Sequence, residues 1–163
     1  MIVSKLLNLQ AALERRRSIS RLVFTNGIFD LLHAGHVIYL QQARALGEAL
    51  FLGLNSDAGV RTLKGPTRPL VSQNDRACVL SALSCIEAII LFDDPTAHRL
   101  IETLQPEVYV KGGDYVLDPN QPGTPLPEAP AVLAYGGQVE LIPYQSGHST
   151  TGLVQRILDR YCD

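Results

Sequence analysis

The sequence predicts an α/β protein with one parallel sheet covered by helices on both faces. Helical and extended patterns alternate along the chain, the expected strands are short and almost wholly apolar, and each distinctive polar cluster directly follows an expected strand. Apolar strands separated by helices are typical of a parallel sheet buried on both faces. These observations favour a Rossmann-like doubly wound parallel sheet, and a length of 163 residues fits a single domain over residues 1–163.

Helices are expected where apolar residues recur at three- and four-residue intervals or where capping residues mark an end. Ser72 has the chemistry of an N-cap. Asp94 followed by Pro95 pairs a cap residue with proline at the first helical position. The expected helices cover residues 4–16, 34–46, 72–83, 94–104 and 151–161, and a short helix or loop covers 58–63.

Strands are expected at residues 22–25, 49–54, 86–92, 107–110 and 139–142. Residues 116–130 differ from the rest because they contain five prolines, at positions 119, 122, 125, 127 and 130. This stretch is predicted to be a loop without helix or strand. A lid near a substrate and a tolerated surface insertion are both open interpretations of it.

Composition limits the class of protein. The net charge of −2 gives no general attraction to nucleic acid or to a membrane, and no apolar run is long enough to span a bilayer. The three cysteines lack Cys-x-x-Cys spacing, which fits a reducing compartment. We expect a soluble, cytoplasmic protein. Only 18% of residues are charged, which suggests surface covered by another copy, as in a homodimer or higher homo-oligomer.

The most informative segment is residues 22–36, where an apolar run meets the turn Asn26-Gly27, the acid Asp30 and then His33 and His36. A helix is expected directly afterwards. Helix starts offer unpaired N–H groups and the positive end of the helix dipole, so they bind anions. Two imidazoles at such a place predict a bound phosphate.

Two other interpretations of the histidine pair exist, namely a zinc pair and histidines packed in the core. Zinc normally takes four ligands. Neither His98 nor His148 lies at ligand-like spacing from His33 and His36.

Residues 25–36 resemble the signature of the cytidylyltransferase-like nucleotidyltransferases, whose hallmark is His-x-Gly-His. Further segments at 63–69, 111–115 and 147–151 follow in order and resemble the heptose 1-phosphate adenylyltransferase branch of that family. The resemblance runs from about residue 10 to the C-terminus. It implies that D-glycero-β-D-manno-heptose 1-phosphate attacks the α-phosphorus of ATP, releasing pyrophosphate and giving ADP-heptose for lipopolysaccharide core biosynthesis.

The same resemblance implies Mg²⁺ as cofactor, a nucleoside triphosphate and a sugar 1-phosphate as substrates, and a separate heptose kinase and phosphatase in the pathway. A phosphomonoester is already anionic near neutral pH, because its second pKa is about 6. No general base is therefore needed. The residues must position the two substrates and stabilise charge on the phosphoryl oxygens.

The resemblance also assigns residues. His33, His36 and Lys64 are the candidate catalytic residues. The candidate nucleotide-binding residues are Thr25, Asn26, Gly27, Ile28, Phe29, Asp30, His33, Gly35, His36, Arg76, Gly113, Asp114, Gly147, Ser149, Thr150 and Thr151. The candidate substrate-binding residues are Asn55, Asp57, Arg61, Lys64, Arg68, Lys111 and Asp114.

Several of these assignments have an ordinary structural alternative. Asp30 is a candidate Mg²⁺ ligand or only part of a turn, Arg76 binds phosphate or is a surface arginine, and Lys64 is expected in a flexible loop where a solvated lysine is the alternative. Ser149 and Thr150 either bind an anion or cap a helix, and both roles can coexist.

At two positions the sequence departs from the patterns of the family, and two alternative functions remain open. Ile28 stands where the heptose branch usually has cysteine, and Tyr144 stands where glycerol-phosphate cytidylyltransferases have arginine, which argues against glycerol phosphate. The alternatives are a cytidylyl- or guanylyltransferase for another sugar or polyol phosphate, and a non-catalytic nucleotide-binding regulatory module. The sequence leaves the base open.

Overall fold

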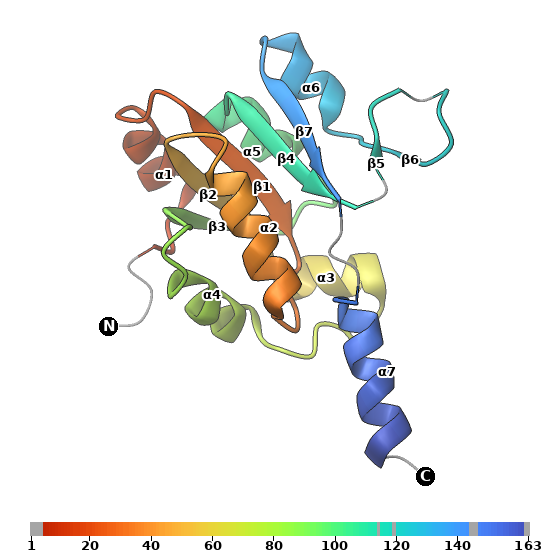
Figure 1. Cartoon of the computed structure of the whole chain (residues 1–163). Coiled ribbons are helices and arrows are strands. Elements are labelled where there is room, and N and C mark those ends of the chain that lie inside the picture. Colours follow the sequence, from red (N-terminus) through yellow and green to blue (C-terminus); the bar gives the residue numbers. More distant parts are fainter. Residues whose placement is uncertain (1–4, 114, 119, 144–146, 162–163) are drawn as a thin grey trace.

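The computed structural model describes residues 5–113, 115–118, 120–143 and 147–161 (Figure 1). At its centre is a five-stranded sheet in the order β3-β2-β1-β4-β7. All neighbouring strands are parallel. The strands are β1 (Leu22–Gly27), β2 (Ala49–Asn55), β3 (Ala88–Phe92), β4 (Val108–Gly112) and β7 (Gln138–Ile142). The predicted α/β fold with a doubly wound parallel sheet is confirmed.

The strand order reverses between β1 and β4. From β1 the chain first builds outward through β2 and β3, and then returns to add β4 and β7 on the other side. Thr25 of β1 is paired with Val110 of β4, so the next residues, Asn26 and Lys111, reach the edge of the sheet together. In open α/β sheets, ligands bind beyond the carboxyl ends of the strands at such a reversal.

Helices cover both faces of the sheet. The described helices are α1 (Leu9–Arg16), α2 (Ala34–Arg44), α3 (Asp57–Lys64), α4 (Gln73–Ser81), α5 (His98–Leu104), α6 (Ala129–Ala134) and α7 (Thr150–Tyr161). Helices α1 and α5 lie on one face, and α2 and α4 on the other (Figure 1).

The core has two layers because alternate strand residues point to opposite faces of the sheet. Phe24, Phe51 and Tyr109 belong to one buried cluster. Leu50 and Leu52 belong to the other, with residues of α2 and α4. Strands buried on both faces explain the unbroken apolar runs of the sequence.

Helix α1 begins five residues later than predicted. The side chain of Asn8 accepts a hydrogen bond from the backbone N–H of Ala11 at 2.8 Å and so caps the helix. Leu6 was expected inside the helix. It instead forms an isolated parallel bridge with Ile89 of the edge strand β3. The leucine spacing could not distinguish these two uses of an apolar residue.

Helix α5 begins at His98 and not at Asp94-Pro95. The N–H of Ala97, its N-cap residue, donates to the Glu128 carboxylate at 3.0 Å. A carboxylate from elsewhere in the chain thus serves the start of this helix, and the local cap signal at Asp94 was misleading.

The prediction that residues 116–130 hold no helix or strand was wrong. Two-residue strands β5 (Tyr115–Val116) and β6 (Thr124–Pro125) pair in a separate small sheet, and α6 begins at Ala129. Leu126, Glu128 and Ala129 are buried. The second half of this segment is therefore anchored in the core.

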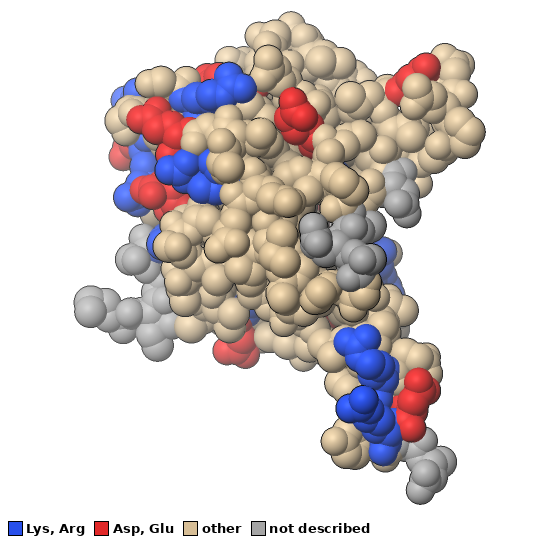
Figure 2. All heavy atoms as spheres, viewed as in Figure 1, with Lys and Arg blue, Asp and Glu red and all other residues tan. Residues whose placement is uncertain are grey.

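Helix α7 has no buried residue and extends away from the sheet (Figure 1). In the space-filling view, basic side chains form a line along α7, and a broad uncharged surface separates them from mixed charges at the far side of the molecule (Figure 2). In the part of the chain that the structure describes, no helix has the length and apolarity to cross a membrane.

Candidate active site

A cavity of about 900 Å³ lies at the carboxyl ends of the strands, at the reversal between β1 and β4. Segments after β1, β2 and β4 line it, together with the start of α7. The predicted site residues that line it are Asn26, Gly27, Ile28, Phe29, Asp30, His33, Gly35, His36, Asn55, Lys64, Arg68, Lys111, Ser149, Thr150 and Thr151. Four segments distant in sequence therefore share one cavity.

The turn after β1 is shaped by Gly27 and Phe29. Phe29 adopts a positive φ of 50°, which is uncommon for a residue with a side chain. Its ring folds back so far that a Cβ on residue 27 would lie 2.8 Å from it. The ring of Phe29 also packs on His36, with ring centroids 5.3 Å apart. Gly27 is therefore needed so that Phe29 can support the histidine.

His33 and His36 stack at the start of α2. Their ring centroids are 3.9 Å apart with an interplanar angle of 22°. His33 is the N-cap residue, and its backbone N–H donates to Nδ1 of His36 at 3.4 Å. A neutral imidazole that accepts at Nδ1 carries its proton on Nε2. His36 can therefore donate an N–H to a ligand in the cavity.

Both histidines favour the neutral form. Burial, and then the nearby His33, lower the pKa of His36 from 6.5 to about 4. Burial, followed by the charges of His148 and Arg156, lowers the pKa of His33. Near neutral pH the pair thus presents hydrogen-bond donors, and most of the positive charge facing an anion must come from other residues.

Lys111 lies at the end of β4 and contacts Asn26 at the end of β1. Its Nζ donates to the backbone and side-chain oxygens of Asn26, at 3.2 and 2.9 Å, and Tyr109 donates to the same side chain at 2.7 Å. Burial lowers the pKa of Lys111 to about 8, and the charge of Glu128 opposes this shift. Asn26 therefore holds the ammonium group at the strand reversal.

Lys64 lies at the end of α3 and not in the loop where the sequence placed it. Gly65 follows as the C-cap with a φ of 93°, a conformation that favours glycine. Lys64 and Arg68 both line the cavity. The helix holds Lys64 at a defined position near the cavity, so the expectation of a flexible loop is corrected.

Asp30 anchors the loop before α4. Its carboxylate lies 2.7 Å from Nε of Arg68 and accepts hydrogen bonds from the backbone N–H groups of Leu70 and Val71 at 2.8 and 2.9 Å. The carboxylate is buried and occupied by these contacts. These contacts support the structural turn role of Asp30, and its role as a Mg²⁺ ligand stays a prediction.

Arg76, a candidate phosphate ligand with a surface arginine as the alternative, is not on the surface. Arg76 is buried, and its guanidinium donates to the carbonyl oxygens of Val71, Ile28 and Asn55 at 3.0, 2.6 and 2.9 Å. It also pairs with Asp57 at 2.7 Å. Arg76 therefore joins the β1 turn, the end of β2 and the start of α4. Asp57, which forms this ion pair, is not among the described residues that line the cavity.

The remaining predictions divide into three groups. Thr25 is buried and its hydroxyl lies 2.7 Å from that of Tyr39, which itself lines the cavity. Three other predicted residues are described by the structure but do not line the cavity, namely Arg61, Gly113 and Gly147. Asp114 and Tyr144 lie outside the described residues.

Sequence reasoning missed several residues that line the cavity, among them Tyr39, Thr96, Glu128 and His148. Tyr39 follows His36 by three residues on α2, and this helical spacing was a usable signal. Glu128 had no signal in a proline-rich stretch. The spacing argument set His148 aside, yet its ring centroid lies 6.1 Å from that of His33.

Metal ligands were sought among the same side chains. Within the described ranges, no three His, Cys, Asp or Glu side chains lie together in a way that could hold a metal ion. The zinc interpretation of His33 and His36 therefore gains no support from these residues. A divalent cation that enters with a triphosphate is coordinated largely by phosphate oxygens and water.

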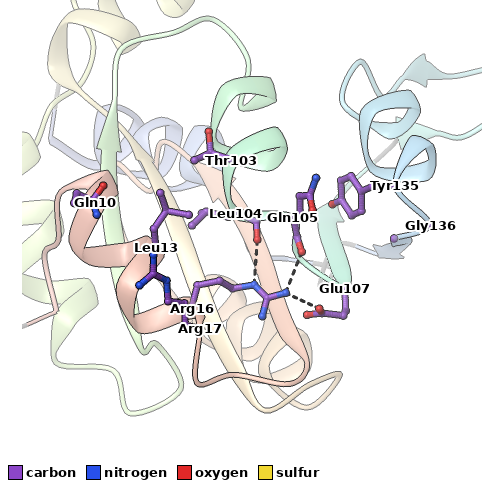
Figure 3. A pocket seen from close by; sticks show the side chains of 11 residues that line it. Gln10, Leu13, Arg16, Arg17, Thr103, Leu104, Gln105, Glu107, Tyr135 and Gly136 are labelled. Atoms are coloured by element: carbon purple, nitrogen blue, oxygen red, sulfur yellow. Dashed lines mark hydrogen bonds and ion pairs between the residues drawn. The ribbon is translucent and has the colours of Figure 1, made fainter.

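A second cavity of about 530 Å³ lies at the opposite, amino end of the strands (Figure 3). Its most prominent cation, Arg16, donates to the carbonyl oxygens of Leu104 and Gln105 at 3.0 and 3.2 Å and pairs with Glu107 at 2.5 Å. These contacts satisfy the C-terminal end of α5. Arg16 is thus occupied by structural contacts in this second cavity.

Comparison with known proteins decides the family. A family model described as cytidylyltransferase-like matches residues 24–151. The chain belongs to the cytidylyltransferase-like family. The match includes the His-x-Gly-His turn, so the resemblance predicted from residues 25–36 is confirmed.

Relatives of this cytidylyltransferase-like chain are similar over most of its length. Bifunctional protein HldE of Syntrophotalea carbinolica is 56% identical over 148 residues, which are 91% of this chain and 29% of the relative. Bifunctional protein HldE of Geobacter sulfurreducens is 55% identical over 141 residues, 86% of this chain and 28% of the relative. The chain thus spans less than a third of the length of these relatives.

Solved structures show the same fold. The lipopolysaccharide core biosynthesis protein from Thermoplasma volcanium is 23% identical with a TM-score of 0.58, covering 77% of this chain and 96% of that one. Pantothenate synthetase from Thermus thermophilus is 17% identical with a TM-score of 0.55, covering 85% of this chain and 61% of that one. At sequence identities this low, the similarity shows that the fold is shared and nothing more.

Proposed function

We propose that this chain transfers an adenylyl group from ATP to D-glycero-β-D-manno-heptose 1-phosphate, giving ADP-heptose and pyrophosphate. The observation that carries the proposal is the convergence of four ordered segments on one cavity. They contribute His33 and His36, then Lys64 and Arg68, then Lys111, and finally Ser149–Thr151. The similarity to proteins named bifunctional protein HldE supports the heptose branch over other branches of the family.

The proposed reaction needs no base from the protein. The sugar phosphate attacks as an anion, since its second pKa is about 6. Its oxygen forms a bond to the α-phosphorus while the bond to the β-phosphate breaks, and the electron pair leaves with pyrophosphate. The protein must align these atoms and stabilise the charge on the transferred group.

His36 and His33 suit this task as neutral donors. The Nε2–H of His36 and the free N–H groups at the start of α2 can donate to the α-phosphoryl oxygens. The pKa of His36, about 4, keeps the ring neutral near neutral pH. The ring therefore acts as a hydrogen-bond donor and not as a positive charge. This explains two histidines without a neighbouring carboxylate partner.

Lysines supply the positive charge on two sides of the cavity. Lys64 projects from the end of α3 and Lys111 from the end of β4, so the anionic substrates lie between them. Mg²⁺ bound to the triphosphate would add charge at the β- and γ-phosphates, held by phosphate oxygens and water. The carboxylate of Asp30 meanwhile contacts Arg68 and two backbone N–H groups.

Pyrophosphate release tests the proposal. ATP, CTP, GTP and UTP are each combined with D-glycero-β-D-manno-heptose 1-phosphate and with other sugar and polyol phosphates. We expect release to depend on ATP and on the heptose phosphate. His36→Ala should lower kcat by about 10²–10³, the usual loss when one such donor is removed, with thermal unfolding little changed.

The alternatives predict other outcomes of the same assay. Turnover with CTP or GTP and a different phosphate would favour a cytidylyl- or guanylyltransferase. Nucleotide binding without release of pyrophosphate from any combination would favour a regulatory module and overturn the proposal. Near-normal turnover in His36→Ala would overturn the role of the histidines.

We also propose the setting in which the reaction occurs. The sugar 1-phosphate would come from a heptose kinase and phosphatase, and the chain would act in the cytoplasm as a homodimer or higher homo-oligomer. Support for assembly comes from the low charge of the chain, 18% of residues, and from the exposed apolar side chains of α7.

A further inference from the structure

The active-site cavity has two chemically different walls. One wall is the start of α2, where the stacked histidine pair presents hydrogen-bond donors. The other wall consists of Pro95 and Thr96, which precede α5, and of Pro127 and Glu128, which precede α6. We call this second wall the α5–α6 wall. Adenylyl transfer uses the donors of the first wall, whereas the α5–α6 wall offers acceptors.

The α5–α6 wall lies on the opposite face of the sheet from α2. Leu126 and Ala129, on either side of Glu128 in the sequence, are buried in the same cluster as Tyr109 of β4. Leu40 of α2 belongs to the other buried cluster. Helices α5 and α6 also pack against each other. The cavity therefore extends across the end of the sheet, and a ligand in it can contact groups from both faces.

Glu128 is buried at this wall although it carries an acid. Its carboxylate accepts a hydrogen bond from the backbone N–H of Ala97 at 3.0 Å, and only 3% of the residue is exposed. After burial, the charge of Glu128 raises the pKa of Tyr109, and it raises the pKa of Lys111 against the effect of burial. The carboxylate therefore lies close to the end of β4. An ionised carboxylate has about four acceptor positions, and the Ala97 N–H uses one of them.

Thr96 adds a hydroxyl group to the same wall. It directly precedes Ala97, whose N–H group binds Glu128, so both side chains belong to one short segment of the cavity lining. The Thr96 hydroxyl lies 2.8 Å from Nδ1 of His98, which fixes its position. A hydroxyl has one proton and two lone pairs, so at least one lone pair remains whichever atom donates in this contact. The wall thus combines a neutral acceptor with a charged one.

The chemistry of the α5–α6 wall does not suit a phosphate. Two acids occur among the described residues that line the cavity, and one of them, Asp30, pairs with Arg68 at 2.7 Å. The other, Glu128, repels a phosphate but accepts strong hydrogen bonds from uncharged hydroxyl groups. Lys111, whose charge Glu128 stabilises, attracts a phosphate instead. A ligand with a phosphate at one end and hydroxyl groups at the other would satisfy both side chains.

We propose that Glu128 and Thr96 bind hydroxyl groups of the sugar 1-phosphate and so select a polyhydroxylated sugar as the acceptor of the nucleotidyl group. The proposal rests on the nucleotidyl transfer proposed above and adds the residues that recognise the body of the sugar. The phosphate of the sugar lies toward Lys111 and the histidine pair, and its hydroxyl groups donate to the α5–α6 wall. Such a site rejects ligands that lack hydroxyl groups, because its buried acceptors are then left unpaired.

NMR titrations of the full chain test this with four probes: D-glycero-β-D-manno-heptose 1-phosphate, D-mannose 1-phosphate, ATP, and methyl phosphate, which has no hydroxyl groups. The pH is kept well below the Lys111 pKa of about 8, so that this cation stays charged. We expect Glu128→Gln and Thr96→Val each to weaken binding of the heptose phosphate about tenfold, which is about 1.4 kcal/mol. The glutamine keeps an oxygen for Ala97 but turns an N–H donor toward the sugar. Binding of methyl phosphate and of ATP should not change.

Two variants serve as matched controls. Glu102 is an exposed acid on α5, and Glu102→Gln should leave the affinities for all four probes unaltered. Thr96→Ser keeps the hydroxyl group and should retain the affinity for the heptose phosphate. An equal loss for methyl phosphate would show a general effect on phosphate binding or on folding, and would overturn the proposal. A loss for ATP alone would assign the wall to the ribose, and unchanged binding of the sugar phosphates would leave Glu128 a purely structural role; both outcomes contradict the proposal.

The proposed function and this inference can fail separately. If the variants weaken only the binding of mannose 1-phosphate, the heptose fails as the substrate while the recognition of sugar hydroxyl groups stands. If the wild type binds the heptose phosphate through Glu128 but releases no pyrophosphate from any nucleotide, the transfer reaction fails and the binding site stands. If the heptose phosphate is turned over and Glu128→Gln leaves its KM unchanged, the reaction stands and the inference is wrong. The absence of any sugar phosphate binding to the wild type also rules the inference out.

Discussion

At the scale of single residues, the state of His36 governs the site. Its ring is stacked on His33 at 3.9 Å, packed on Phe29 and fixed by a hydrogen bond to Nδ1. Burial and these neighbours favour an uncharged ring. The neutral ring then keeps its Nε2–H as a hydrogen-bond donor toward the cavity.

The lowered pKa of His36 predicts how stability depends on pH. Between the ordinary value of 6.5 and about 4, the unfolded chain binds a proton that the folded chain does not. The free energy of unfolding should therefore fall as pH decreases through this window. Urea unfolding at several pH values checks this, and the fall should be smaller in His36→Gln. An identical pH dependence in wild type and variant would contradict the assignment.

Lys111 predicts the pH dependence of activity. Its pKa of about 8 means that the free enzyme loses this positive charge above that pH, so kcat/KM for the sugar phosphate should decline there. The charge of Glu128 raises the Lys111 pKa, and Glu128→Gln should therefore move the decline to lower pH while keeping an oxygen for Ala97. The measurement is a pH profile of kcat/KM.

Glu102 on α5 provides the control for this profile because its side chain is exposed. Glu102→Gln should leave the alkaline decline where it is. A decline that stays unchanged in Glu128→Gln would show that another group sets it.

At the scale of elements, Arg76 joins parts that would otherwise be independent. It links α4 to the turn after β1 and to the end of β2, and pairs with Asp57 at the start of α3. Three segments that shape the cavity thus depend on one buried guanidinium. In this structure these contacts of Arg76 are structural ones.

This interpretation predicts a loss of stability in Arg76→Ala. Removal leaves Asp57 without its cation and three carbonyl oxygens without their donor, so the free energy of unfolding should fall by about 3 kcal/mol. Chemical and thermal unfolding measure it, and Arg61→Ala, an exposed arginine on α3, is the control. Unchanged stability with a raised KM for ATP would instead support phosphate binding.

Elements whose signals are local were predictable from the sequence. The apolar runs located the strands of the main sheet to within about two residues, since burial on both faces leaves a continuous pattern. The start of α5 and the structure within residues 116–130 were not predictable. The start of α5 depends on a contact from Glu128, which lies 31 positions away from Ala97 in the sequence.

At the scale of the whole molecule, the location of the site followed from topology. Parallel strands place their carboxyl ends at one edge, so polar clusters after β1, β2 and β4 had to meet. The sequence could not show which charged side chains are already paired within the protein. Asp30 and Arg76 were expected to face ligands and are occupied by protein groups, whereas His148 was set aside and lines the cavity.

The exposed side of α7 bears on the proposed homodimer. Ile157, Leu158 and Tyr161 are 47%, 45% and 81% exposed, and α7 buries no residue against its own chain. An amphipathic helix normally buries its apolar face. A second copy of the chain can cover this face, and the arrangement would also fix α7, which begins at the cavity.

Light scattering after size exclusion tests this arrangement. We expect the mass of a dimer for the wild type and of a monomer for the double variant Ile157→Asp, Leu158→Asp, because two carboxylates on the apolar face cannot be buried without large cost. Leu133→Asp, a 58% exposed leucine on α6, should remain dimeric. A monomeric wild type would show that there is no such dimer. A double variant that still dimerises would show that the interface lies elsewhere.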